Sequence, residues 1–477
     1  MGDQLEICYE PGVVTDRSAQ PLGGRSAVRA DGGRGFDVVY FDSTDWTGPE
    51  VGTATFRDGR ILHFDRVPGV SNMRSFSFRA TSTFTPVVDG DHILTLVQAG
   101  RARLLVDGQV VVDGIAQPMP LGEEFFGMGS AEADAAVPMV AGRPVEVTVE
   151  WTSEGAAFIS GAKVGVRTPS PDDLMDRAVA AATEADVVVL VVGTNHDWET
   201  EGRDRESMDL PGDQPELIRR VCAANSDTVV VVNAGSVVTS DWADVAPAVL
   251  QTWFGGQEMA DALVDVLVGD DEPSGRLPTT VPHRLQDTPA FLHYPGENGR
   301  VAYSEGLFTG YRWYEARRLP VAFPFGHGLG YTSFTWGEPS LGEIPSIAEL
   351  EAGATVTVTL PVTNDGDRAG SEVVQCYVAP TDPRLTRPVR ELQGFAKVRL
   401  EPGGSADVVV VLDHRAFAYW DPGDPGHSER SSRVPVAAGQ GSGPRGEPGW
   451  YVDPGTYELH MGRSSADIRY VVAVDLG

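Results

Sequence analysis

One stretch, Asp186 to Ile218, constrains the fold more than any other part of the sequence. It begins with six apolar residues, Val187 to Val192, nearly all β-branched, a pattern typical of a strand covered on both faces. Gly193 ends the run, an acidic loop follows, and a helix is expected from about Gln214. Ligand sites in open α/β sheets lie beyond the carboxyl ends of the strands. This loop is therefore where we expect a functional site.

The rest of the sequence divides into three regions that differ in their predicted secondary structure. Residues 25–165 are rich in strand-like segments, and Asp107-Gly108 between two of them is a strong two-residue hairpin signal. Residues 170–335 alternate between helical and strand periods, which predicts a parallel sheet with helical crossovers. From about residue 350 the strand pattern returns, and a segment rich in Gly, Pro and Ser over 423–449 predicts a mobile loop. The sequence thus indicates an α/β domain together with two β-sandwiches.

Length and charge limit the classes of protein to be considered. A chain of 477 residues suggests two to four domains. The net charge of −31 argues against a nucleic acid or an anionic membrane as the partner, because both require a positively charged surface. A neutral substrate is favoured.

The cysteines and histidines argue against a metal site, and the N-terminus argues against a signal peptide. The three cysteines are far apart, and the nine histidines show no paired ligand spacing, so neither a metal nor another cofactor is expected. The N-terminus has neither the basic nor the apolar region of a signal peptide. No window approaches 18 apolar residues, so no membrane span is expected and the cytoplasm is the predicted location.

The acidic loop itself has an unusual composition. It carries Asp197, Glu199, Glu201 and Asp204 around Trp198 and two arginines. Clustered carboxylates beside a tryptophan are more typical of a site that cleaves sugars than of a phosphate or metal site. The alternative from the residues alone is a solvated acidic loop.

Three long sequence segments carry a specific resemblance to a known protein family. They are VVNAGSVVTSDWADVAPAVLQTWFGGQE (231–258), EPSGRLPTTVP (272–282) and EGLFTGYRWYEARRLPVAFPFGHGLGYTSF (305–334). In this order they closely resemble glycoside hydrolase family 3, the β-glucosidase family. The sequence from Ala352 onward resembles that family's fibronectin-III-like domain, and PLGEEFFGMGS (120–130) resembles part of a protective-antigen-type β-sandwich that some members insert.

The resemblance implies a fold of α/β plus all-β class. Residues 1–24 would lead into the α/β domain, 25–165 would form the inserted β-sandwich, 166–340 would form the α/β sandwich domain with its parallel sheet and the acid/base loop, and 341–477 would form a fibronectin-III-like, immunoglobulin-like β-sandwich.

The resemblance also implies a component that we do not find in this sequence. Family members carry the nucleophilic Asp on a (β/α)₈-type barrel, and the first strand of the α/β domain precedes the inserted sandwich. No segment here resembles either one. A missing strand would leave a sheet edge and an apolar face uncovered. We therefore expect a second polypeptide that supplies both, the alternative being that the sequence is a piece of a longer protein.

For the chemistry, the resemblance implies an acid/base Glu in a Glu-Gly-x-Asp-Arg setting, which here is Glu201 to Arg205. Glu201 would protonate the leaving oxygen and later deprotonate water. Glu199 is the rival for this role. Asp204 and Arg205 have two interpretations, a pair that ties the loop down by hydrogen bonds or a pair that contacts substrate.

Three aromatic residues are further candidates for binding substrate. Trp198 could stack on a sugar face or simply pack beside the strand end. Phe125 and Phe126 would lie on the inserted sandwich, where the resemblance implies a loop over the pocket mouth with aromatics flanking the aglycone. The alternative for both is a place in the core of a strand.

Together these expectations describe the acid/base-bearing part of a retaining β-glucosidase-like hydrolase. It would act on terminal β-linked sugars and would be active only with a barrel chain. The alternative is a non-catalytic carbohydrate-binding or scaffolding protein derived from such an enzyme.

Overall fold

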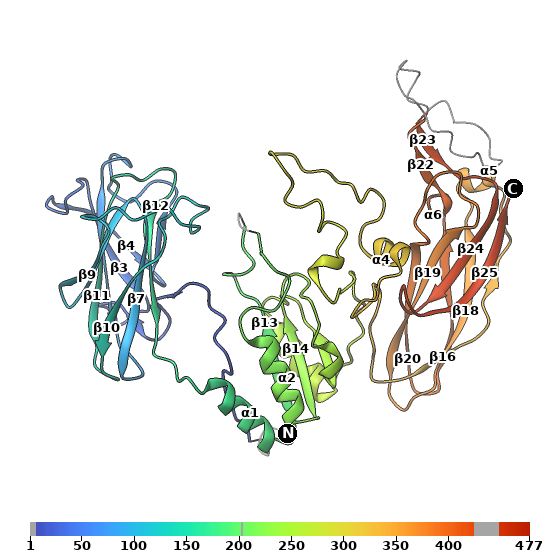
Figure 1. Cartoon of the computed structure of the whole chain (residues 1–477), viewed down its shortest axis with the longest axis horizontal. Helices are drawn as coiled ribbons and strands as arrows, with labels where there is room; N and C mark the ends of the chain where they lie inside the picture. Colours follow the sequence, from blue (N-terminus) through green and yellow to red (C-terminus); the bar gives the residue numbers. More distant parts are fainter. Residues whose placement is uncertain (1–5, 202–203, 424–447) are drawn as a thin grey trace. The chain divides into compact units, whose positions relative to one another are not determined.

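The computed structural model describes residues 6–201, 204–423 and 448–477, drawn in Figure 1 with colours that follow the sequence. The chain divides into two compact units. Most of the predicted loop over 423–449 falls on residues 424–447, outside the described residues. The first unit comprises Met1–Glu206, Leu210–Ser236 and Val245–Gln251, and the second comprises Ser207–Asp209, Val237–Asp244 and Thr252–Gly477.

Two antiparallel sheets form the first part of the first unit. One has five strands, in the order β1-β12-β7-β10 with β5 beside β12, and the other has seven, in the order β4-β3-β6-β11-β8-β9 with β2 beside β6. Alternate residues of both sheets meet in one core that includes Tyr40, Leu94 and Trp151. The strands are β1 (Gln20–Pro21), β2 (Ala27–Val28), β3 (Phe36–Phe41), β4 (Glu50–Phe56), β5 (Arg60–His63), β6 (Ser77–Phe84), β7 (Gly90–Ala99), β8 (Arg101–Val106), β9 (Gln109–Asp113), β10 (Ala133–Met139), β11 (Val145–Thr152) and β12 (Ser160–Arg167).

The predicted hairpin turn is present between β8 and β9. Asp107 has φ 46° and Gly108 has φ 76°, so both central residues are left-handed. A two-residue turn with two positive φ angles matches the twist of the flanking strands, and Asp-Gly is among the pairs that adopt it at least cost.

We expect a buried histidine to make the stability of this β structure depend on pH. His63 lies among the rings of Tyr40, Phe56, Phe76 and Phe78, and burial lowers its pKa to about 4 from an ordinary 6.5. Between pH 6.5 and about 4, His63 is protonated in the unfolded chain but neutral in the folded chain. The unfolding free energy therefore falls as the pH drops through this range.

We expect this titration to remove about 2–3 kcal/mol of unfolding free energy. The measurement is urea unfolding of the whole chain at pH 7 and pH 4.5, followed by hydrogen exchange of peptides that cover β3. In His63→Phe the acid-dependent part should shrink, whereas an unchanged pH profile would show that other groups cause it.

The second part of the first unit is a small parallel sheet. Strands β13 (Val188–Gly193), β14 (Thr228–Asn233) and β15 (Ala248–Gln251) pair in that order. Helix α2 (Gln214–Ala224) is the expected crossover between β13 and β14, and helix α1 (Leu174–Glu184) precedes β13. Gly193 marks the end of β13 for a steric reason. A Cβ there would lie 1.8 Å from the carbonyl oxygen of Asn233, so β14 leaves no room for a side chain.

Five residues of the predicted run, Val188 to Val192, lie in β13, but within the described residues only one face of this strand is covered. Val188 and Leu190 pack against the core between α1 and α2. Their neighbours point the other way, as the two-residue period of a strand requires, and Val187, Val189 and Val191 are 63%, 45% and 59% exposed. Among the described strands, β13 is also at the edge of its sheet. The described residues therefore do not provide the cover on both faces that the apolar run predicts, because an apolar pattern shows that a face avoids water but not what covers it. An uncovered sheet edge and apolar face are what we expected from the sequence for a sheet without its first strand.

The second unit is dominated by another pair of antiparallel four-stranded sheets that share one core. One sheet has the order β16-β18-β17 with β21 beside β18, and the other has the order β20-β19-β24-β25. Strands β22 and β23 form a separate hairpin. The strands are β16 (Phe334–Trp336), β17 (Ser340–Leu341), β18 (Val356–Asn364), β19 (Gly370–Pro380), β20 (Glu391–Leu400), β21 (Ser405–Leu412), β22 (Tyr419–Asp421), β23 (Gly449–Tyr451), β24 (Gly455–Gly462) and β25 (Ile468–Leu476).

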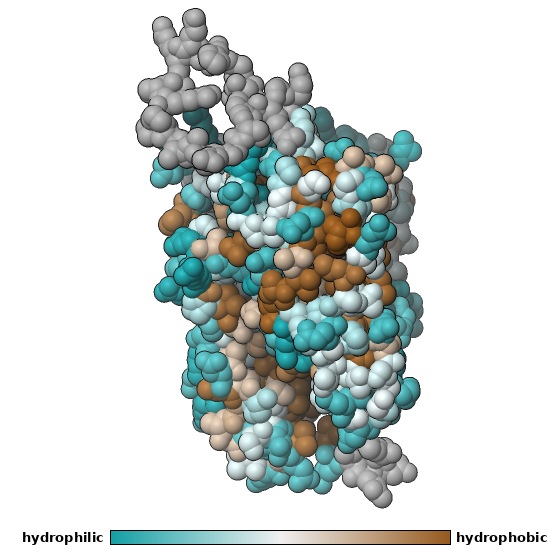
Figure 2. Space-filling model, turned by 90° about the vertical axis from the view of Figure 1, so that its right-hand side faces the viewer, coloured by the Kyte–Doolittle hydropathy of each residue, from teal (hydrophilic) through white to brown (hydrophobic). Residues whose placement is uncertain are grey.

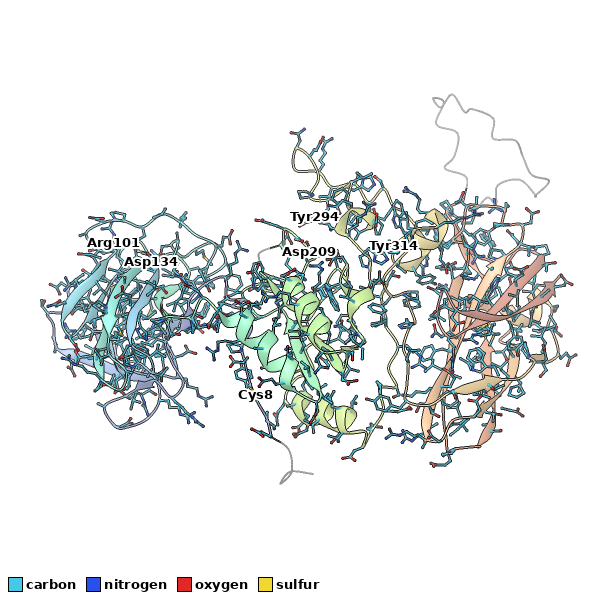
Figure 3. The ribbon with its side chains drawn as sticks, turned by 60° about the horizontal axis from the view of Figure 1, so that its bottom comes forward. Cys8, Arg101, Asp134, Asp209, Tyr294 and Tyr314 are labelled. Carbon is cyan, nitrogen blue, oxygen red and sulfur yellow. The ribbon has the colours of Figure 1, made fainter. Side chains whose placement is uncertain are left out.

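The second unit also contains helices and irregular segments outside this sandwich. On α4 (Tyr311–Arg317), Tyr314 is buried and the hydroxyl of Tyr311 accepts a 2.8 Å hydrogen bond from the amide of Leu392. Tyr294 lies in a bend outside the helices and is exposed (Figure 3). The helices are α3 (Met259–Val268), α4 (Tyr311–Arg317), α5 (Ile347–Glu351) and α6 (His414–Phe417), with 3₁₀ turns η2 (Ala243–Val245) and η3 (Leu285–Asp287).

The surface of the described residues is mixed in character. Figure 2 shows apolar side chains gathered among polar ones on the side turned toward the viewer. Exposed apolar residues occur on both sheets of the sandwich in the second unit, among them Phe395 and Val471 on one sheet and Val409 and Val411 on the other. None of the described helices combines the length and the apolar character that a membrane crossing requires.

Candidate active site

A pocket of about 270 Å³ lies in the first unit, where the β structure meets the loop after β13. It brings together three of the residues expected from the sequence, Glu201, Phe125 and Phe126. The other lining residues are Arg17, Ser18, Arg60, Leu62, Glu123, Glu124, Lys163, His196, Asp197 and Thr200. A wider hollow of about 690 Å³ among Arg29, Arg34 and Arg57 contains none of the expected residues, so we assign the chemistry to the smaller pocket.

The acidic loop is anchored by Asp197. Its buried carboxylate accepts hydrogen bonds from the backbone amides of Arg17 and Ser18, at 3.2 and 3.1 Å, and from the Ser18 hydroxyl at 3.0 Å. Three donors around one carboxylate hold a loop firmly, because a charged acceptor strengthens each bond. Asp197 therefore fixes the loop against the segment that precedes β1.

Trp198 makes a contact of the same kind. Its indole nitrogen donates to the carbonyl oxygen of Thr15 at 2.6 Å, and the Arg17 guanidinium lies 5.7 Å from its ring centroid. Trp198 is not among the residues that line the pocket. These contacts place it in the anchoring of the loop, and stacking of its ring on a sugar stays a prediction.

Glu199 and Arg205 tie the loop to the end of the neighbouring strand. Glu199 accepts hydrogen bonds from the Thr194 hydroxyl and from the amide of Gly235, the latter at 3.1 Å. Arg205 donates to the Ser236 hydroxyl at 3.0 Å and lies 3.8 Å from the Glu199 carboxylate. The loops after β13 and β14 are thus joined at the carboxyl edge of the sheet, where ligand sites in open α/β sheets lie. Neither side chain lines the pocket.

Glu201 differs from the other carboxylates of the pocket. Glu123 is bound by Arg17 at 3.1 Å, Glu124 by Lys163 at 2.6 Å, and Asp197 by its three donors. The side chain of Glu201 is exposed and has no hydrogen-bond or ion-pair partner among residues 6–201, 204–423 and 448–477; Gly202 and Arg203, which follow it, lie outside these ranges. An uncommitted carboxylate at a pocket can exchange protons with a substrate, which the committed ones cannot do without breaking their contacts.

Phe125 and Phe126 lie on a turn, not in the core of a strand. They have φ angles of 56° and 59°, a conformation uncommon for bulky residues, and Phe126 is 58% exposed. The amides of Gly127, Met128 and Gly129 close the turn onto the carbonyls of residues 123–125. Strained backbone that exposes an aromatic at a pocket is typical of a binding element.

Several pocket residues were not expected from the sequence. Lys163 comes from β12 and Arg60 from β5, while Arg17 and Ser18 precede the first strand. A hint was available for Lys163, since it is one of only two lysines in a chain whose other basic residues are all arginine. No group of His, Cys, Asp and Glu that could hold a metal ion occurs among the described residues.

Comparison with known proteins places this geometry in context. The family model described as the glycosyl hydrolase family 3 C-terminal domain matches residues 91–331, and that of the fibronectin type III-like domain matches residues 372–465. The first of these matches includes the pocket residues from Glu123 to Glu201.

Relatives of known sequence and structure agree with these matches. The chain is 41% identical to a β-glucosidase from Rhizobium radiobacter over 92% of its own length and 51% of the relative, and 41% identical to a probable β-glucosidase I from Emericella nidulans over 71% and 42%. The structure of β-glucosidase from Kluyveromyces marxianus in complex with glucose matches with a TM-score of 0.85 and 31% identity, over 99% of this chain and 54% of the other. The chain spans about half the length of these relatives.

Proposed function

Since the chain belongs to glycosyl hydrolase family 3, we propose that it is the acid/base-bearing part of a retaining β-glucosidase-type hydrolase. Its substrates would be terminal β-linked sugars of oligosaccharides or of glycosylated small molecules. The observation that carries the proposal is Glu201, the one pocket-lining carboxylate left uncommitted within the described residues.

In the proposed mechanism Glu201 protonates the glycosidic oxygen as the bond to the sugar breaks. A nucleophilic carboxylate attacks the anomeric carbon from the other side and forms a glycosyl intermediate. Glu201, now ionised, then removes a proton from the water that releases the sugar. Retaining enzymes hold the two carboxyl groups about 5–5.5 Å apart, so the nucleophile must be brought close to the pocket mouth.

We propose that a second polypeptide with a (β/α)₈-type barrel supplies that nucleophile. Support comes from β13, which is an edge strand among the described strands. Val189 and Val191 on its outward face, and Val187 directly before it, are exposed. Exposed apolar faces and unpaired strand edges are typical of surfaces that another polypeptide covers. The relatives, which are about twice as long, carry enough additional chain to provide such a cover.

We also propose that residues 25–165 are an inserted protective-antigen-type sandwich. The chain contacts the helical layer both before and after this region. Glu10 pairs with Arg177 of α1 at 2.8 Å, and Val13 packs with the core between α1 and α2. A chain that starts on one domain, leaves it and returns is the expected course of an insertion.

The test is hydrolysis of an aryl β-glucoside by this chain alone and co-expressed with a family 3 barrel polypeptide. We expect turnover only when both chains are present, because the nucleophile and the acid/base would lie on different chains. Robust hydrolysis by the isolated chain would refute the need for a partner. A folded chain that binds glucose but is inactive in both preparations would instead favour a non-catalytic carbohydrate-binding protein.

A further inference from the structure

We propose that Lys163 is a positioning residue that joins the two walls of the pocket and thereby sets how tightly the enzyme holds the aglycone. The inference rests on the proposed function of Glu201. One wall is the turn with Phe125 and Phe126, and the other is the loop from His196 to Glu201.

The connection is a continuous chain of hydrogen bonds. The Lys163 ammonium donates to Glu124 Oε1 at 2.6 Å and to Ser18 Oγ at 2.9 Å. Ser18 Oγ in turn donates to Asp197 Oδ1 at 3.0 Å. Glu124 directly precedes the two phenylalanines, and Asp197 lies four residues before Glu201. Lys163 thus links the aromatic turn to the acid/base loop through a single intermediate residue.

Charge and burial make this link hard to replace. The Lys163 side chain is only 3% exposed, and an ammonium removed from water requires close negative partners. Lys163 also lies directly opposite Arg60 in the register of β12 and β5, and like charges facing each other across strands are destabilising. The Glu124 carboxylate at 2.6 Å, with that of Asp197 one hydroxyl further on, balances the charge of Lys163.

The residue type also fits this role. Lys163 and Lys397 are the only lysines among 37 basic residues, so the position departs from the arginine preference of the chain. A lysine ammonium is a compact point charge that can donate to partners in different directions, whereas the planar guanidinium of arginine favours forked contacts with one planar acceptor. Glu124 and Ser18 are separate partners, which suits an ammonium.

The consequence concerns binding more than chemistry. Without Lys163 the acid/base loop keeps the two backbone bonds from Arg17 and Ser18 to Asp197. The aromatic turn loses the cation that holds Glu124 and keeps the more exposed ion pair between Arg17 and Glu123. Phe125 and Phe126 should therefore be held less firmly at the pocket. We therefore expect aglycone binding to weaken while proton transfer by Glu201 continues.

The experiment compares Lys163→Met with Lys397→Met in the complex with the barrel polypeptide. Lys397 is a matched control, since its ammonium donates to the hydroxyl of Ser274 at 2.6 Å in the second unit, away from the pocket. For an aryl β-glucoside we expect Lys163→Met to raise KM about tenfold and to change kcat less than threefold, with Lys397→Met equal to wild type. Glu124→Gln should raise KM similarly, and the double variant should be no worse than either single one, because both remove the same link.

A second readout does not depend on turnover. Hydrogen exchange of residues 121–129 in the unliganded chain should be faster in Lys163→Met and Glu124→Gln than in wild type and Lys397→Met. If the wild-type complex were inactive but the exchange rates differed as expected, the proposed function would be wrong and the link through Lys163 would still be supported. The proposed link is wrong if the complex is active and neither Lys163→Met nor Glu124→Gln changes KM or the rate of hydrogen exchange. It is also wrong if the effects of the two substitutions on KM add up in the double variant.

Discussion

Glu201→Ala should lower kcat/KM for an aryl β-glucoside with a poor leaving group about 10³-fold in the complex with a barrel polypeptide, because general acid catalysis supplies about 10²–10⁴-fold. The loss should be much smaller for a dinitrophenyl glucoside, whose leaving group needs no proton. Azide should restore turnover of that substrate and give a glucosyl azide, since a small anion can attack the intermediate without a general base.

Glu199→Ala is the control that separates the two candidate acids. In the structure Glu199 accepts hydrogen bonds from Thr194 and Gly235 and lies outside the pocket lining. We expect its removal to loosen the loop, which lowers activity for all leaving groups alike and gives no rescue by azide. If azide rescued Glu199→Ala and not Glu201→Ala, the roles of the two residues would be reversed.

Local patterns in the sequence predicted the parts of the fold that depend on local physics. The apolar run before Gly193 forms β13, the following segments form α2 and β14, and the turn at Asp107-Gly108 is present. These features follow from side-chain periodicity and backbone preference, which neighbouring residues determine. The expectation of a site beyond the strand end follows from the same reasoning, and the described pocket includes Glu201.

Contacts between residues distant in sequence could not be predicted in this way. Ser18, Glu124, Lys163 and Asp197 come from four separate segments, and no periodicity relates them. For Phe125 and Phe126 the residue types fitted both a strand core and an exposed turn, and only the backbone conformation distinguishes the two. The pairing of distant segments depends on the whole fold, which explains why the second wall of the pocket was only partly expected.

The phrase EPSGRLPTTVP (272–282), one of those that carry the family resemblance, has a structural role in the second unit. Arg276 within it donates to Glu372 on β19 at 3.0 Å, and the amide of Ser371 donates to the Glu272 carboxylate. Glu372 also accepts a hydrogen bond from Arg463 Nε at 2.6 Å. These contacts hold the segment 272–282 against the sandwich. They give Glu272 and Arg276 a structural role that does not require any part in catalysis.

Glu372→Ala should destabilise the second unit by about 3–5 kcal/mol, the cost of breaking a buried ion pair by removing one partner. The Glu372 side chain is 0% exposed and is the shared partner of Arg276 and Arg463, so its loss leaves two guanidinium groups close together with no counter-charge between them. The measurement is urea unfolding of the whole chain, followed by hydrogen exchange of peptides from β19. Asp467→Ala removes an ion pair with Arg469 that is more than 40% exposed on both sides, and it should cost less than about 1 kcal/mol. Equal unfolding midpoints for the two variants would show that the buried charges are solvated without their partner, and that packing alone holds the family phrase against the sandwich.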